Sequence, residues 1–161
     1  MPKITPFLWF DHQAEEAAKF YVSVFKKDSK ITAVSRYGES GPGPKGSVMT
    51  VAFRLNRQEF IALNGGPHYK FTEAVSFVIN CETQREIDVF WRKLSKGGKE
   101  IQCGWLRDKY GLCWQIVPAI LPKLIRAKYP DRSERVMKAL MGMVKLNIAA
   151  LQRAYAGHLA P

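Results

Sequence analysis

The sequence predicts an α+β fold, built from two copies of a strand–helix–three-strand (βαβββ) module and completed by C-terminal helices. The stretch 73–118 reads as one complete module. Moving it back by seventy residues places Phe77 on Phe7 and Phe90 on Phe20, so the first part of the chain repeats it. After this stretch the residues change to helix formers. An internal repeat of this kind decides the architecture before any single element does.

The composition allows one structural domain overall, because 47% of the 161 residues are hydrophobic and 24% are charged. We expect a first module over 1–64, a connecting loop over 65–73, a second module over 74–118 and a helical extension over 119–161. No apolar run reaches the roughly 18 residues of a membrane span, and the N-terminus lacks the apolar core of a signal peptide. We therefore expect a cytoplasmic protein with no membrane partner.

The formal net charge of +11 suggests an anionic partner. Its lysines and arginines are spread along the chain without a nucleic-acid-reading motif, so nucleic acid is not expected and anionic small molecules fit better. The cysteines, Cys81, Cys103 and Cys113, are odd in number and lack CxxC spacing. This indicates reduced thiols and neither a disulfide framework nor a structural zinc site.

The first module begins with an apolar strand over 4–10, after which Asp11 is placed to cap a helix that runs to about Phe25. Apolar residues recur along this helix at helical spacing, so one of its faces should lie on a sheet. Three strands follow, over 31–37, 49–55 and 59–64. The middle strand alternates apolar and polar residues, which is typical of a strand with two different faces.

The loop 38–47 is rich in glycine and proline, like a phosphate-binding loop. Gly43 is followed by Pro44 where a Walker sequence needs lysine, and a strand follows where it needs a helix. No GxGxxG motif opens a helix elsewhere, so a dinucleotide or methyl-donor loop is not indicated either. The loop is a plain connector or a lid.

The second module repeats this order. A strand over 75–80 precedes a helix. The helix begins with a capping box of Thr83 and Glu86 and ends at a pair of glycines. We place its last strands over 100–103, 105–108 and 112–117. Asp108 begins the turn between the last two, where aspartate is favoured for backbone hydrogen bonding.

The extension contains a helix over 120–129, a second one from Asp131, and a last one that Asn147 caps and Gly157 ends. The second helix has a stripe expected in a core or an interface, made of Met137, Leu140, Met141 and Val144. The extension has more apolar surface than two small sheets need, so we expect its helices to pack on a sheet edge, on a partner subunit or on both, and we predict a homodimer.

Four phrases resemble the PhnB-like family, which is also catalogued under a demethylubiquinone methyltransferase domain name: ITPFLWFDHQAEEAAKFYVSVF, RYGESGPGPKGSVMTV, ALNGGPHYKFTEAVSF and CGWLRDKYGLCWQIVP. The resemblance runs to about Gly157 and places the chain near the vicinal oxygen chelate superfamily of glyoxalases, bleomycin-resistance proteins and dioxygenases. It implies curved mixed sheets around a cup-shaped cavity, commonly completed in a homodimer.

In metal-dependent relatives, the resemblance implies, the first and last strands of each module hold a divalent ion. Counting back about fourteen residues from the helix phenylalanines places the first-strand positions at Pro6 and Ser76. The last-strand position falls at Gln115, and its repeat partner is Ala62. Proline and alanine cannot ligate and serine is a poor ligand, whereas a catalytic divalent site normally needs about three good ligands. We therefore expect no metal and no cofactor.

A metal-free cavity would be aromatic and apolar with a few polar groups. We expect the ligand-binding residues to be Asn64, Ser76, Cys113, Gln115 and Trp105. With a period of two, the residues beneath the second helix should be Phe77, Ile79, Trp114 and Ile116. His68 and Cys103 are candidate catalytic residues, as a proton carrier and a thiol nucleophile, although a surface histidine and a structural thiol are simpler interpretations.

Three functions follow. The first is binding of a small organic molecule, which could be anionic, in a metal-free cavity. The alternative is a metal-dependent glyoxalase, dioxygenase or lyase-type enzyme with ligands from elsewhere, such as His68 or a dimer partner. Methyltransferase activity rests on the family name alone. Whether the protein is an enzyme stays open at this point.

Overall fold

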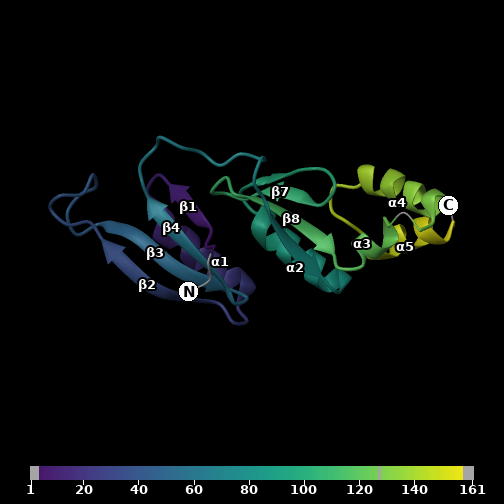
Figure 1. The fold of residues 1–161 in the computed structure, drawn as a ribbon, viewed down its shortest axis with the longest axis horizontal. Coiled ribbons are helices and arrows are strands. Elements are labelled where there is room, and N and C mark those ends of the chain that lie inside the picture. The colour runs from purple at the N-terminus through teal and green to yellow at the C-terminus, as the bar shows by residue number, and fades with distance from the viewer. Residues whose placement is uncertain (1–3, 127, 158–161) are drawn as a thin grey trace. The chain divides into compact units, whose positions relative to one another are not determined.

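The computed structural model describes residues 4–126 and 128–157 and divides the chain into two compact units, Met1–Phe71 and Thr72–Pro161. Each unit contains a four-stranded mixed sheet with a helix packed on it (Figure 1). The predicted α+β fold, with strand, helix and three strands in each module, is confirmed.

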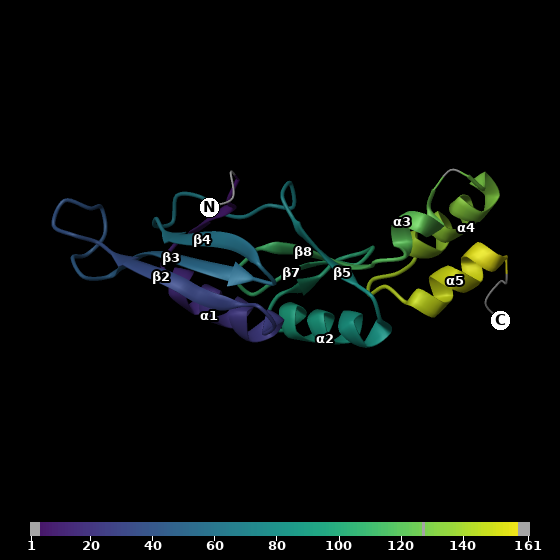
Figure 2. The same ribbon diagram turned by 60° about the horizontal axis from the view of Figure 1, so that its bottom comes forward.

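The first sheet contains, in spatial order, β1 (Phe7–Phe10), β4 (Gln58–Asn64), β3 (Val48–Leu55) and β2 (Lys30–Arg36). β1 is parallel to β4, and the other neighbours are antiparallel. The helix α1 (Ala14–Phe25) lies along one face (Figure 2). Its buried residues are Ala14, Ala17, Ala18, Tyr21 and Val24, and those of the sheet are Leu8, Phe10, Val51, Phe53, Leu55, Phe60 and Ala62. The opposite face of the sheet keeps half-buried and exposed side chains.

The helix α1 is capped by a residue that is distant in the sequence. Asn64 Oδ1, at the end of β4, accepts a hydrogen bond from Ala14 N at 2.8 Å, while Asn64 Nδ2 donates to Val48 O at 3.0 Å. The prediction that Asp11 caps this helix is wrong, because the helix begins at Ala14 and its N-cap position is Gln13, which makes no side-chain cap.

The second sheet contains β5 (Phe77–Cys81), β8 (Cys113–Pro118), β7 (Trp105–Arg107) and β6 (Lys99–Glu100), in that order. The helix α2 (Gln84–Ser95) packs on it, and the capping box is confirmed: Thr83 Oγ1 accepts from Glu86 N, and Glu86 Oε2 accepts from Thr83 N.

Of the strand predicted over 100–103, only Glu100 is in a strand, at the end of β6. Cys103 and Gly104 take left-handed backbone conformations, with φ of 61° and 80°, which a strand cannot accommodate. Their amides donate instead to Met143 O and Val144 O, each at 2.8 Å. The end of the predicted strand is therefore a docking point for the extension.

The helices of the two modules correspond as predicted, since α1 and α2 begin and end seventy residues apart. The strands correspond with an offset of seventy-one. The last residues of β1 and β5 are Phe10 and Cys81, both buried on the helix-covered face. Leu8 and Ile79, each two residues earlier in its strand, are also both buried on the helix-covered face. The connection from strand to helix is one residue shorter in the second module.

The predicted match of Phe7 with Phe77 is therefore wrong by one residue. Phe7 is 57% exposed on the face away from α1, whereas the ring of Phe77 packs on buried Trp114, with 5.7 Å between the ring centroids. Ala62, which was matched to Gln115, is fully buried on the α1 face. A sequence alignment anchored on the helix cannot detect this one-residue change in the connection.

The extension has its own small core. It contains α3 (Leu121–Leu124), α4 (Pro130–Met141) and α5 (Ile148–Ala156), so the helix predicted over 120–129 is only four residues long. The core residues are Leu121, Leu124, Val136, Leu140, Leu146 and Leu151. The caps of α5 are confirmed: Asn147 Oδ1 accepts from Ala150 N at 2.9 Å, and Gly157 ends the helix with φ of 89°.

Within one chain, the stripe predicted for a core or an interface contributes to the core only through Leu140. Leu140 is buried, but Met137, Met141 and Val144 are 38%, 56% and 44% exposed. The buried face is instead formed by Val136 and Leu140, which are four residues apart and so lie one turn above each other.

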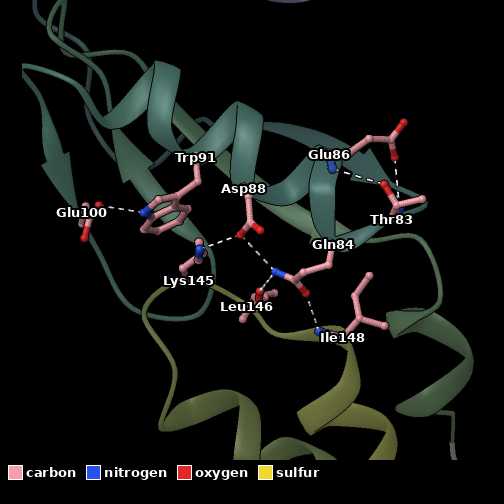
Figure 3. A network of polar contacts seen from close by, with 9 residues as sticks. All are labelled: Thr83, Gln84, Glu86, Asp88, Trp91, Glu100, Lys145, Leu146 and Ile148. Carbon is pink, nitrogen blue, oxygen red and sulfur yellow. Dashed lines mark hydrogen bonds and ion pairs between the residues drawn. The ribbon is translucent and has the colours of Figure 1, made fainter.

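Polar contacts attach the extension to α2 (Figure 3). Gln84 Nε2 donates to Leu146 O at 3.1 Å, and Gln84 Oε1 accepts from Ile148 N at 2.9 Å. Lys145 Nζ forms an ion pair with Asp88 Oδ1 at 2.6 Å. One glutamine thus satisfies two backbone groups at the start of α5.

Candidate functional site

The open face of the second sheet is the candidate site, because it gathers most of the predicted binding residues. Along β8, Trp114 and Ile116 are 2% and 0% exposed beneath α2, and Gln115 points to the opposite, half-buried face. Trp105 of β7 is the direct cross-strand partner of Gln115. Paired residues of neighbouring strands present their side chains on the same face. The predicted alternation along β8 is confirmed.

A hydrogen bond fixes the polar centre of this face. Gln115 Nε2 donates to Ser76 Oγ, just before β5, at 2.9 Å. Gln115 Oε1 has no partner within residues 4–126 and 128–157, and neither has the indole N–H of Trp105. The face therefore offers an oriented acceptor and an N–H donor beside an aromatic ring, which is a usual combination for recognising a small organic molecule.

A charged pair borders the same face and was not predicted. Arg107 Nη1 lies 3.6 Å from Glu73 Oε1, with 40% and 54% of the side chains exposed. Arg107 is two residues after Trp105, so the period of two along β7 could have identified it. Glu73 precedes β5 in an irregular segment, where no periodicity marks it.

Cys113 lies in the strand but offers no accessible sulfur. It is fully buried, and burial raises the pKa of its thiol; the carboxylate of Glu73 raises it further, while Arg107 lowers it. The thiol is therefore protonated near neutral pH and is a weak nucleophile. Its contribution to this face is packing.

The remaining predicted residues lie elsewhere. Asn64 belongs to the first unit, and its carboxamide is engaged by α1 and Val48. His68 is exposed in the segment after β4. Cys103 lies against the extension, with its sulfur 3.6 Å from that of Met141. Cys103 is thus not on the face of Ser76 and Gln115, and His68 belongs to the first unit.

Asn64 lines a cavity of about 500 Å³ beneath the loop 38–47. Tyr37 anchors this loop: its hydroxyl donates to Asn64 O at 2.6 Å, and a Cβ on either Gly41 or Gly43 would overlap its ring. Gly41 and Gly43 are therefore needed for close packing on Tyr37. This packing explains why loop 38–47 is rich in glycine, like a phosphate-binding loop.

The side chains on the open face of the second sheet do not suit a divalent metal ion. Its donors are the Ser76 hydroxyl and the Gln115 amide, and the nearest carboxylate, Glu73, is paired with Arg107. In the part of the chain that the structure describes, no three His, Cys, Asp or Glu side chains gather closely enough to hold a metal. A catalytic zinc or iron site normally uses such ligands.

None of the described helices is both long and apolar enough to cross a membrane. A search of curated proteins found no match. A family model described as 3-demethylubiquinone-9 3-methyltransferase matches residues 2–117. The resemblance predicted to reach Gly157 thus ends before the extension.

One solved structure agrees with this family, and others share the fold. A PhnB protein from Bacillus cereus, provisionally described as a 3-demethylubiquinone-9 3-methyltransferase, is 42% identical, with a TM-score of 0.66 over 73% of this chain and 99% of its own. Protein PA1353 from Pseudomonas aeruginosa is 19% identical, with a TM-score of 0.58 over 71% and 95%.

The fosfomycin resistance protein FosX from Listeria monocytogenes is 11% identical, with a TM-score of 0.57 over 78% of this chain and 99% of its own, and so shares the fold alone. The duplicated βαβββ architecture and these matches agree with the resemblance drawn from the sequence. The chain therefore belongs to the PhnB-like family described as 3-demethylubiquinone-9 3-methyltransferase.

Proposed function

We propose that the protein binds a small organic molecule on the open face of the second sheet, without a metal ion held by its own residues. The observation that carries the proposal is the Ser76–Gln115 hydrogen bond beside Trp105. This pair holds a carboxamide in one orientation on a half-buried surface, so a ligand meets a preorganised acceptor. Arg107 at the border favours ligands with a carboxylate or another anionic group.

The chemistry of this face favours binding over catalysis. Its groups are an indole, a hydroxyl, a carboxamide and an ion pair, and the thiol of Cys113 is buried and protonated. None of them is a strong base or nucleophile near neutral pH.

The test is a ligand screen by NMR with aromatic carboxylic acids and amides. We expect hits to shift the amide signals of Ser76, Trp105 and Gln115. Gln115→Leu should weaken binding of the best hit about tenfold, the usual cost of losing one hydrogen bond to a charged or oriented group. Gln152→Leu, on an exposed site of α5, is the matched control and should leave binding unchanged. Hits that bind Gln115→Leu equally well would contradict the proposal.

The methyltransferase description of the family gives a separate hypothesis. A methyltransferase binds its methyl donor, so calorimetry with adenosylmethionine distinguishes it from the proposal. We expect no saturable heat. Stoichiometric binding of adenosylmethionine would replace our proposal with this alternative.

We also propose a homodimer. Support comes from apolar side chains exposed on the extension, namely Ile125, Tyr129, Met137, Met141 and Val144, which a second copy could cover. A cytoplasmic location is proposed as well, because all three cysteines are free thiols.

A further inference from the structure

A second, basic cavity lies in the first unit, at the end of the sheet where α1 leads into β2 and β3 turns into β4. Its volume is about 520 Å³, and its lining residues are Lys26, Asp28, Ser29, Lys30, Arg54 and Arg57. None of these residues belongs to the open face of the second sheet, so this cavity is separate from the proposed ligand site.

The two turns that form the cavity contain cations in an unfavourable backbone conformation. Lys26 and Arg57 have φ of 59° and 72°, in the left-handed region that favours glycine. Asp28 and Asn56 are also left-handed, with φ of 50° and 45°, but aspartate and asparagine tolerate this region. Strain of this kind persists only where the surrounding structure enforces it, and it clusters at functional sites.

The turn from β3 to β4 shows the conflict most clearly. Leu55 pairs with Gln58, so Asn56 and Arg57 are the two central residues of the hairpin. A two-residue hairpin with two positive φ angles strongly prefers Asn-Gly. Asn56 follows this rule and Arg57 does not.

Arg57 is held over the cavity by its neighbour across the turns. Arg57 Nε donates to Asp28 Oδ2 at 3.0 Å, and Arg57 N donates to Asp28 O at 3.3 Å. This ion pair is largely exposed, with 81% and 40% of the side chains accessible, so it contributes little to stability. The ion pair therefore does not offset the cost of the left-handed backbone at Arg57, and a glycine at this position would give a more stable turn.

The charges around the cavity do not balance. Arg54 pairs with Glu59, with Nε donating to Oε1 at 2.8 Å, and Arg57 pairs with Asp28. Lys26 and Lys30 have no carboxylate partner among the described residues. Four cations against two carboxylates leave two positive charges at one small, concave site.

We propose that this cavity binds a phosphate monoester dianion of a small molecule. A monoester carries about −1.5 to −2 charges at neutral pH, which matches the two unbalanced positive charges. Its three terminal oxygens can accept hydrogen bonds from arginine and lysine side chains together. The volume of about 520 Å³ is in the range of small-molecule pockets.

The experiment titrates the full chain with phenyl phosphate, followed by NMR amide shifts at constant ionic strength. We expect saturable shifts centred on residues 26–30 and 54–58. Dimethyl phosphate, a singly charged diester like those of nucleic acid backbones, should bind at least about fivefold more weakly, since half of the charge pairing is lost. Stronger binding of the diester would overturn the proposal, as would shifts that grow linearly without saturation.

Arg57→Gly is the decisive variant because it removes the charge and relieves the turn. It should weaken phenyl phosphate binding about tenfold. Its melting temperature should stay the same or rise, since glycine suits φ of 72°. Unchanged phosphate affinity in Arg57→Gly would overturn the proposal, whatever its stability.

Two controls separate the loss of charge from the change in the turn. Asn56→Gly changes the same turn without removing a cation and should keep phosphate affinity within about twofold, because Asn56 does not line the cavity. Arg92→Ala removes one exposed positive charge from α2, in the other unit, and should have no effect on the shifts. An equal loss in Arg92→Ala would mean that net charge alone attracts phosphate.

Discussion

The three cysteines of the chain differ in how far their side chains are exposed to solvent. Cys81 is 1% exposed, and burial, with the nearby carboxylates of Glu86 and Glu82, raises its pKa from the ordinary 9.0 to about 12. Cys113 is fully buried with a raised pKa. Cys103 is only half-buried, on the surface that faces the extension.

This difference predicts which thiol reacts. At pH 8 iodoacetamide should modify Cys103 well before the other two, because only thiolates react and the raised pKa keeps Cys81 and Cys113 protonated until the pH rises toward their folded values. Peptide mass mapping of the native protein measures the order. In Cys103→Ser native labelling should be almost absent, whereas fast labelling of Cys113 would show that the open face of the second sheet is more accessible than described.

Single residues also show what a sequence can predict. Asp108 was expected as a turn former, and its Oδ1 accepts from Tyr110 N and Leu112 N, at 2.9 and 3.1 Å. Its second oxygen accepts from Trp114 Nε1 at 2.8 Å. This contact joins the turn to the next strand, and turn preferences alone do not predict it. The cap that Asn64 provides was missed for the same reason, since the two partners are fifty residues apart.

At the scale of elements, hydrogen bonds join the extension to the second module. Gln84 bonds the backbone at Leu146 and Ile148, and the left-handed turn at Cys103 and Gly104 bonds Met143 and Val144. Gly104 has to be glycine, because a Cβ there would meet Ile116 O at 2.8 Å and Leu146 at 3.0 Å.

Gln84→Ala should loosen this joint. Loss of two hydrogen bonds leaves a half-buried carbonyl and amide without partners, which costs about 1–3 kcal/mol of unfolding free energy. Urea denaturation followed by circular dichroism measures it. Gln152→Ala, on the exposed side of α5, is the control and should change the free energy by less than about 0.5 kcal/mol. Equal stability of both variants would show that the leucine core alone holds the extension.

Element types were predictable from periodicity, and element lengths were not. The capping box of α2 lies within four consecutive residues, so the sequence contains all of it. The ends of β6 and α3 depend on tertiary contacts: β6 ends where the chain docks on the extension, and α3 is limited to one turn. The one-residue change in the strand offset depends on which face each strand buries, a property of the folded sheet.

At the scale of the whole molecule, the extension lies outside the part of this chain that the family model matches. The family model ends at residue 117, and the Bacillus cereus PhnB protein is matched over nearly its whole length by 73% of this chain. The leucine core, the exposed methionines of α4 and the joint to α2 are therefore additions to the shared fold.

If the extension forms a homodimer interface, light scattering at micromolar concentration should give about twice the 18.3 kDa of one chain. Met137→Glu combined with Met141→Glu places charges on exposed positions and should give a monomer that is still folded, because neither side chain is in the core. Lys138→Glu, on the same helix and exposed, is the control for added charge. A monomer in the unmodified protein would rule out the dimer.

The two ways of capping the modules' helices have a consequence during protein synthesis. The signal that starts α2 is complete once Glu86 has left the ribosome, so this helix can form while the rest of its module is still being made. The start of α1 has to wait for Asn64, fifty residues later, and until then its first turn lacks a partner. The first module would therefore become ordered only after its last strand, β4, has been synthesised, whereas the second module begins to order from α2.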